Sequence, residues 1–342
     1  MPEPVQPQPV VGQLTQAALF LVLTIDEGGE EATRGLLESI SGIARAVDFR
    51  SAGVRLQVVT GIGSQAWDRL FSGARPAHLH TLEELHGDTH HMPSTPGDLL
   101  FHVRGDEQSV CFEVGRQIMN QLRDVTTVVD EVHGFLSFGR RNLLGFMDGT
   151  ESPSGEEGDD AALVGDDDPE FTGGSYVIAQ KYRFDMDAWE GISTEEQERV
   201  IGRSKMDDIE MSDDVKPTNS HIALNVIEDE NGEELDIVRA NMPFGTFKDG
   251  DMGTYFIGYA SDPATTEQML TNMFIGDPPG NHDRLLDFST ALTGGLFFAP
   301  TIDFLDELPP PPEVAEEPEE VPQAPVQAGS LAIGSLKRSV LR

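Results

Sequence analysis

The chain predicts an α+β fold made of two ferredoxin-like domains. Apolar runs and amphipathic stretches in its first half alternate in the order βαββαβ, which is that of a ferredoxin-like sandwich, with one short helix added. A second α+β unit of the same style follows. At 342 residues the chain exceeds one ordinary domain, which favours a duplicated fold with enough material to enclose a ligand.

The first half contains the strand and helix signals of one such unit. Apolar runs predict strands at residues 17–25, 54–62 and 99–103 and within 125–138, and helical periodicity predicts helices at residues 30–47, 64–71 and 107–122. The loop between residues 75 and 97 is rich in histidine, with His78, His80, His86, His90 and His91. Their spacings match no regular metal-ligand pair, and three prolines in the loop favour an exposed, irregular segment.

An acidic connection and a second unit follow. Residues 151–174 are rich in acids and turn formers and lack apolar periodicity, which is typical of a solvated connection, and they fit no twelve-residue calcium loop. Beyond them we expect strands at residues 175–184, 221–226, 235–240, 254–259 and 295–298, and helices at 194–202, 264–274 and 284–291.

Changes in amino-acid composition mark the predicted limits of the two domains and of the terminal segments. Residues 1–13 are proline-rich and predicted to be disordered, the two domains span residues 14–150 and 175–308, and residues 309–328 form a Pro/Glu-rich disordered linker. Residues 329–342 regain apolar side chains at Leu331, Ile333 and Leu336. A short apolar tip after a disordered spacer indicates a docking peptide, although a frayed terminus is the alternative.

The charge narrows the possible partners. The formal net charge of -37 disfavours binding to nucleic acid or to an anionic membrane, because both would repel the chain. The one cysteine, Cys111, suits a reducing cytoplasm. The first basic residue is Arg34, so no secretory signal is indicated, and the longest apolar run is too short for a membrane-spanning helix.

A carboxylate between two glycines is the most informative motif. The segment is Gly145-Phe146-Met147-Asp148-Gly149-Thr150. Glycine suits backbone that turns sharply or approaches a ligand closely, and an aspartate there can act as an acid or base. An ordinary turn aspartate is the alternative interpretation.

Four segments in order resemble the dye-decolourising peroxidases, most closely the cytoplasmic class B. The first is this GxxDG motif; the others are Ser220–Leu224, Ile237–Phe244 and Asp283–Ser289. The resemblance runs from about Leu14 to Leu308. It implies the dimeric α+β barrel superfamily, a haem b cofactor bound mainly by the second domain, and a homo-oligomer, for which a hexamer is one candidate state. The C-terminal tip also resembles the peptides that target cargo proteins to encapsulin shells.

The same resemblance assigns candidate haem-site residues. It implies His221 as the ligand of the haem iron and Asp283 or Asp287 as the acceptor of a hydrogen bond from the other ring nitrogen. Without the resemblance, a lone histidine at this position would more often be a core residue. Gly149 and Thr150 are further cofactor-binding candidates. Peroxide cleavage needs a proton carrier and a fixed positive charge, tasks that match Asp148 and Arg239, while Asn241 is placed to orient a water or the acid. Which of Asp148 and Arg239 dominates is left open.

The predicted function is that of a haem peroxidase. Hydrogen peroxide would be reduced, and organic reductants such as dyes or phenols would each donate one electron, inside an encapsulin nanocompartment in the cytoplasm. Two alternatives remain: a haem- or iron-handling protein with incidental peroxidase activity, and a partner for an iron-storage shell.

Overall fold

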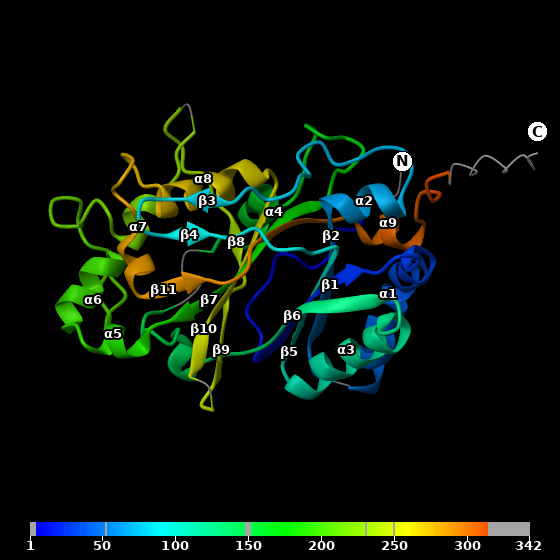
Figure 1. Ribbon diagram of the computed structural model, residues 1–342, viewed down its shortest axis with the longest axis horizontal. Helices are drawn as coiled ribbons and strands as arrows, with labels where there is room; N and C mark the ends of the chain where they lie inside the picture. Colours follow the sequence, from blue (N-terminus) through cyan, green and yellow to red (C-terminus); the bar gives the residue numbers. More distant parts are fainter. Residues whose placement is uncertain (1–4, 52, 148–151, 230, 249, 314–342) are drawn as a thin grey trace, which may run out of the picture. The chain divides into compact units, whose positions relative to one another are not determined.

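The computed structural model describes residues 5–51, 53–147, 152–229, 231–248 and 250–313 (Figure 1). The described residues up to Pro312 form one compact unit. Within the described residues its main sheet has ten strands in the order β6-β1-β5-β2-β12-β7-β10-β8, with β11 paired to β7 and β9 to β10. No helix in this described part of the chain is long and apolar enough to cross a bilayer.

The first half of the chain supplies β6, β1, β5 and β2, with α1 and α3 packed against the sheet (Figure 1). The pairing is antiparallel, and β1 lies between β5 and β6. The elements are β1 (Ala17–Ile25), α1 (Glu30–Arg50), β2 (Leu56–Gly63), α2 (Ser64–Leu70), β3 (Leu85–His86), β4 (His91–Met92), β5 (Leu99–Gly105), α3 (Gln108–Leu122), β6 (Thr126–Phe135) and the 3-10 turn η1 (Phe138–Arg140).

The second half repeats this arrangement, because β12, β7, β10 and β8 stand in the same relative order. Its elements are α4 (Glu156–Ala162), β7 (Ser175–Phe184), α5 (Met186–Glu190), α6 (Thr194–Ile201), α7 (His221–Asn225), β8 (Val238–Arg239), β9 (Met242–Thr246), β10 (Asp251–Ala260), α8 (Pro263–Phe274), the 3-10 turn η2 (Arg284–Asp287), β11 (Ser289–Ala291), β12 (Gly295–Ala299) and α9 (Ile302–Asp306). The predicted duplication of an α+β unit is therefore confirmed.

The two halves share one curved sheet. Phe297 and Phe298 of β12 pair with Gly63 and Ile62 of β2, which joins the halves edge to edge. At the far edges β6 packs against β9, where a Cβ added at Gly134 would lie 2.8 Å from the Cβ of Met242. The sheet thus nearly closes into a barrel, and its concave face buries side chains from both halves, such as Phe20 stacked on Tyr255 with ring centroids 4.2 Å apart.

Three expected elements differ from the structure. In the predicted strand 221–226, residues 221–225 form helix α7, because Ser220 caps the segment by accepting a hydrogen bond from Ala223 N. An apolar run of this length is too short for its periodicity to show whether it forms a strand or a helix. The predicted helix over 284–291 divides into η2 and β11, since Ser289 and its neighbours pair with β7. The histidine-rich loop contains the β3–β4 hairpin.

The acidic connection and the N-terminal segment are more ordered than expected. Within residues 152–174 the chain forms α4, and Val164 and Phe171 are buried. The prediction of disorder is wrong for the described part of residues 1–13: the buried Gln8 side chain donates to Thr60 O and Pro300 O and accepts from Thr60 N, at 2.7–2.8 Å. These bonds fix the segment to both halves of the sheet. The domain boundaries at residues 150 and 175 stay predictions.

Candidate active site

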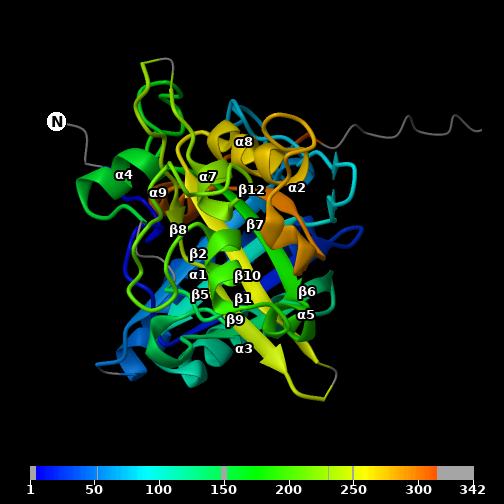
Figure 2. The same ribbon diagram turned by 90° about the vertical axis from the view of Figure 1, so that its left-hand side faces the viewer.

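A cavity lies in the second half of the chain among β7, β10, α7 and α8, which Figure 2 shows gathered in one region. The space between atoms, including the opening to solvent, is about 1190 Å³, slightly above the ~300–1,000 Å³ usual for ligand pockets. Most of its lining is apolar, and Met269, Leu270 and Met273 of α8 contribute to it. His221, Arg239 and Asn241, three of the predicted site residues, line this cavity together.

His221 is the first residue of α7, and its ring is held from one side. Its Nδ1 lies 2.7 Å from Oδ2 of Asp283, whose side chain is fully buried. A carboxylate can only accept here, so the proton is on Nδ1 and the lone pair of the neutral ring is on Nε2. No hydrogen bond to Nε2 occurs among the described residues, and 30% of the side chain is exposed. The geometry therefore leaves one ring nitrogen ready to coordinate a metal.

Asp283, and not Asp287, is the partner of His221. The other Asp283 oxygen accepts a hydrogen bond from Leu285 N at 2.8 Å, so the same carboxylate caps the turn η2. Asp287 lies at the far end of η2, where Oδ1 contacts His90 and His282. Of the two carboxylates that the sequence left open, the structure pairs only Asp283 with the ring.

Arg239 places a positive charge at the cavity. It pairs with Gly258 of β10, and its backbone N donates to Ser152 Oγ at 3.0 Å. Its Nε is buried and has no hydrogen-bond partner among the described residues. An unpartnered donor of a permanently charged group is costly to bury, so this one is available to a ligand in the cavity.

Asn241 also faces the cavity, although it lies just past the end of β8. Its side-chain Oδ1 accepts a hydrogen bond from Ile257 N at 3.1 Å in place of a backbone carbonyl. Ile257 lies between the part of β10 that pairs with β9 and the part that pairs with β8, so this side-chain bond bridges the gap between the two pairings. The expected grouping of Arg239 and Asn241 on one cavity therefore occurs.

The predicted acid Asp148 and the candidates Gly149 and Thr150 lie outside the described residues. The segment that leads to them is described: Phe146 and Met147 line the cavity. Gly145 has a φ of +91°, and a Cβ there would meet the Lys205 side chain. The glycine before Asp148 thus serves the sharp turn and close approach that the motif indicated.

Several cavity residues were not predicted from the sequence. Gln180 and Tyr182 of β7 and Thr254 of β10 line it, and the Tyr182 hydroxyl donates to Gln180 Oε1 at 2.8 Å. Gln180 Nε2 and Thr254 Oγ1 are buried with no partner in the described ranges. Burial, and then the nearby Asp283 charge, raises the pKa of Tyr182, so its phenol stays neutral. Polar residues inside buried strands were the available signal.

Two family models match the chain. The N-terminal model of the Dyp-type peroxidases matches residues 7–136, and the C-terminal model matches residues 139–304. A dye-decolorizing peroxidase from Rhodococcus erythropolis is 58% identical over 336 residues, which cover 98% of both sequences.

Two solved structures are similar throughout the fold. The encapsulated DyP-type peroxidase from Mycobacterium smegmatis, determined by cryo-EM, superposes with a TM-score of 0.89 at 59% identity, covering 90% of this chain and 100% of that one. A variant of DypB from Rhodococcus jostii in complex with heme gives a TM-score of 0.86 at 52% identity, covering 88% and 98%.

The duplicated ferredoxin-like sheet and its histidine-bearing cavity define a haem-binding α+β enzyme. With both family models matched across most of its length, the chain belongs to the dye-decolorizing peroxidase family and is a haem peroxidase. The cavity fits the group: a largely apolar lining suits a macrocycle, and His221 offers Nε2. Arg239 Nε, for which the described part of the chain supplies no partner, is a donor for a bound ligand.

Replacing Asp283 should weaken haem binding. In Asp283→Asn the group that accepts the hydrogen bond from His221 Nδ1 loses its charge. The His221 ring is then a poorer electron-pair donor to the haem iron and is less firmly oriented. We expect the haem dissociation constant to rise by ~10–100-fold, measured by haem titration of the haem-free protein. Asp287→Asn, one turn further on, is the matched control and should bind as the parent does. Equal effects of the two substitutions would contradict a specific role for the His221–Asp283 contact.

Proposed function

We propose that this peroxidase uses haem b, held by His221, to reduce hydrogen peroxide and to oxidise small organic reductants such as dyes and phenols. The observation that carries the proposal is the His221–Asp283 contact at the edge of a cavity that Arg239 and Asn241 also line. The bound haem supplies an iron that can exchange electrons and offers an open position for peroxide. For each peroxide, two electrons and two protons yield two waters, and two reductant molecules give one electron each.

The chain's own residues move the proton and stabilise charge. Asp148 takes the proton from one peroxide oxygen and returns it to the departing oxygen, directly or through a water that Asn241 orients. Arg239 stabilises the negative charge that develops on both oxygens, because its guanidinium is cationic throughout the reaction. Its Nε, which has no hydrogen-bond partner among the residues that the structure describes, supports this role.

Substitution separates the two contributions. Arg239→Leu should slow the first change in haem absorbance after mixing with peroxide by at least ~100-fold, since a preorganised charged donor is removed. Stopped-flow spectroscopy measures this rate, and Arg183→Leu, which removes an exposed arginine of β7, is the matched control.

Asp148→Asn completes the comparison. If this rate falls severely in Asp148→Asn and only mildly in Arg239→Leu, the main role belongs to proton transfer. If it falls severely in Arg239→Leu and only mildly in Asp148→Asn, the main role belongs to charge stabilisation. Equal decreases in the rate would contradict the hypothesis that Asp148 dominates and the hypothesis that Arg239 dominates.

We also propose that the enzyme is a homo-oligomer, with a hexamer as the candidate state, carried inside a cytoplasmic encapsulin shell by residues 329–342. Leu331, Ile333 and Leu336, which lie outside the described residues, would fill apolar pockets on the shell. Two features support this: the apolar tip follows a Pro/Glu-rich spacer, and a relative at 59% identity is an encapsulated DyP-type peroxidase.

Deleting residues 329–342 should abolish packaging and leave catalysis intact. The truncated and full chains are each co-expressed with the shell protein, and the enzyme content of the purified shells is compared by haem absorbance. Peroxidase rates of the free enzymes should agree within error. Undiminished packaging of the truncated chain would contradict the role of the tip.

A further inference from the structure

A second group of ligand-type side chains lies outside the cavity. His90, at the end of the β3–β4 turn, meets His282 and Asp287 next to η2. The Nε2 atoms of His90 and His282 lie 3.1 Å and 3.3 Å from Oδ1 of Asp287. The peroxidase chemistry proposed above uses none of these three residues.

The separations match those of ligands around one small cation. With bonds of about 2.0–2.2 Å to nitrogen and oxygen, tetrahedral ligand atoms stand about 3.3–3.5 Å apart. The candidate ligand atoms all lie within 4.8 Å of one another. The two imidazole rings cross at 68°, so their in-plane lone pairs can converge on a point between them.

The backbone holds the two histidines in place before any ion arrives. Gly87 N donates to His90 O at 3.0 Å, and Gly87 lies so close to Phe274 O at the end of α8 that a Cβ would clash. On the other side, Asp283 N donates to Met273 O at 2.9 Å, directly after His282. Both histidines are therefore anchored to α8, which lowers the entropic cost of binding.

Burial and charge also suit an ion. The exposed fractions of the side chains are 17% for His90, 25% for His282 and 39% for Asp287, which leaves access for an ion and for water as a further ligand. The nearest competing cation, Arg284, lies 3.9 Å from the other oxygen of Asp287 and pairs more closely with Glu196. The Oδ1 atom thus stays available.

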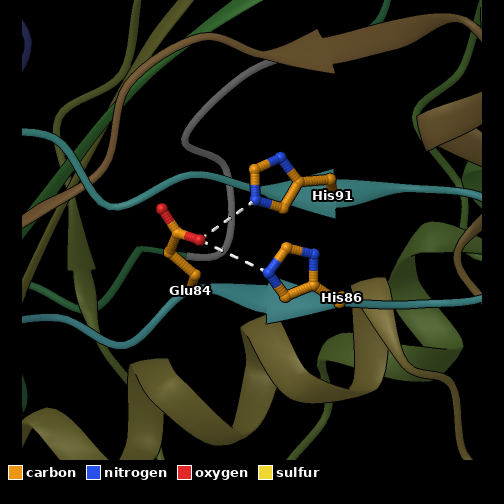
Figure 3. A group of neighbouring side chains, drawn as sticks. All are labelled: Glu84, His86 and His91. Atoms are coloured by element: carbon orange, nitrogen blue, oxygen red, sulfur yellow. Dashed lines mark ion pairs between the residues drawn. The ribbon is translucent and has the colours of Figure 1, made fainter.

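A neighbouring cluster is less suitable. Figure 3 shows Glu84 contacting His86 and His91 across the β3–β4 hairpin, with Nε2 to Oε2 separations of 3.3 Å and 3.6 Å. Their rings are stacked at 12° with centroids 4.4 Å apart, so the two lone pairs lie in nearly parallel, separate planes, which is less suitable for binding one ion. All three side chains are about half exposed or more, and they are free to reorient.

We propose that His90, His282 and Asp287 form a binding site for a divalent transition-metal ion of the zinc type. Two imidazoles and one carboxylate are ligands that Zn²⁺ accepts, with water completing the shell. The ion would link the hairpin of the first half to the turn that carries Asp283. This proposal does not depend on the peroxidase assignment.

The test is isothermal titration of the haem-loaded full chain with zinc chloride in a chelator-free buffer. We expect one site whose affinity falls at least ~10-fold in His90→Ala, which removes one ligand, and in Asp287→Asn, which replaces a charged ligand oxygen by a neutral one. The double variant H86A/H91A is the matched control and should bind as the parent does. An unchanged haem spectrum verifies that each variant is folded.

Three results would overturn the proposal: no zinc binding by the parent, parental affinity in both His90→Ala and Asp287→Asn, or loss of the site in H86A/H91A. The last result would move the site to the Glu84 cluster.

Discussion

A buried carboxylate is the constraint around which the active site is arranged. Asp283 has no exposed side-chain surface, and a charge in such a place is tolerated only where donors surround it. The donors are the His221 ring from α7 and the Leu285 amide of η2. Because the carboxylate cannot be left unpaired, it fixes the ring and the turn relative to each other, and through the ring it determines which nitrogen faces the cavity.

The sheet provides the frame for this contact. Pairing of β12 with β2 joins the two halves, and β7 and β10 lie side by side in the second half, where Gln180, Tyr182 and Thr254 line the cavity. Gln180 and Thr254 have buried polar atoms without partners in the described residues, which is costly unless a ligand occupies the space beside them. These buried polar atoms lower the stability of the fold, and a bound cofactor and its substrate would supply the contacts that they lack.

The sequence predicted the long elements well and the short ones poorly. The strand Ser175–Phe184 and the strand Ala17–Ile25 were found with correct bounds, because long apolar runs allow little ambiguity. Helix α7 was mistaken for a strand because five residues carry too little periodicity, and a side-chain cap decided its form. His221, Arg239 and Asn241 came from the family resemblance; the roles assigned to them remain proposals. Contacts such as that of His90 with Asp287, 197 residues apart, could not be inferred from local spacing.

The most direct test of the account is whether His221 ligates the haem iron. The absorption spectra of the haem-supplied enzyme and of His221→Ala are compared before and after one equivalent of peroxide. We expect an intense Soret band in the parent that shifts transiently with peroxide and a band that is lost or strongly altered in the variant. Identical spectra and identical responses in the two proteins would contradict the account and leave the His221–Asp283 contact without a role in haem binding.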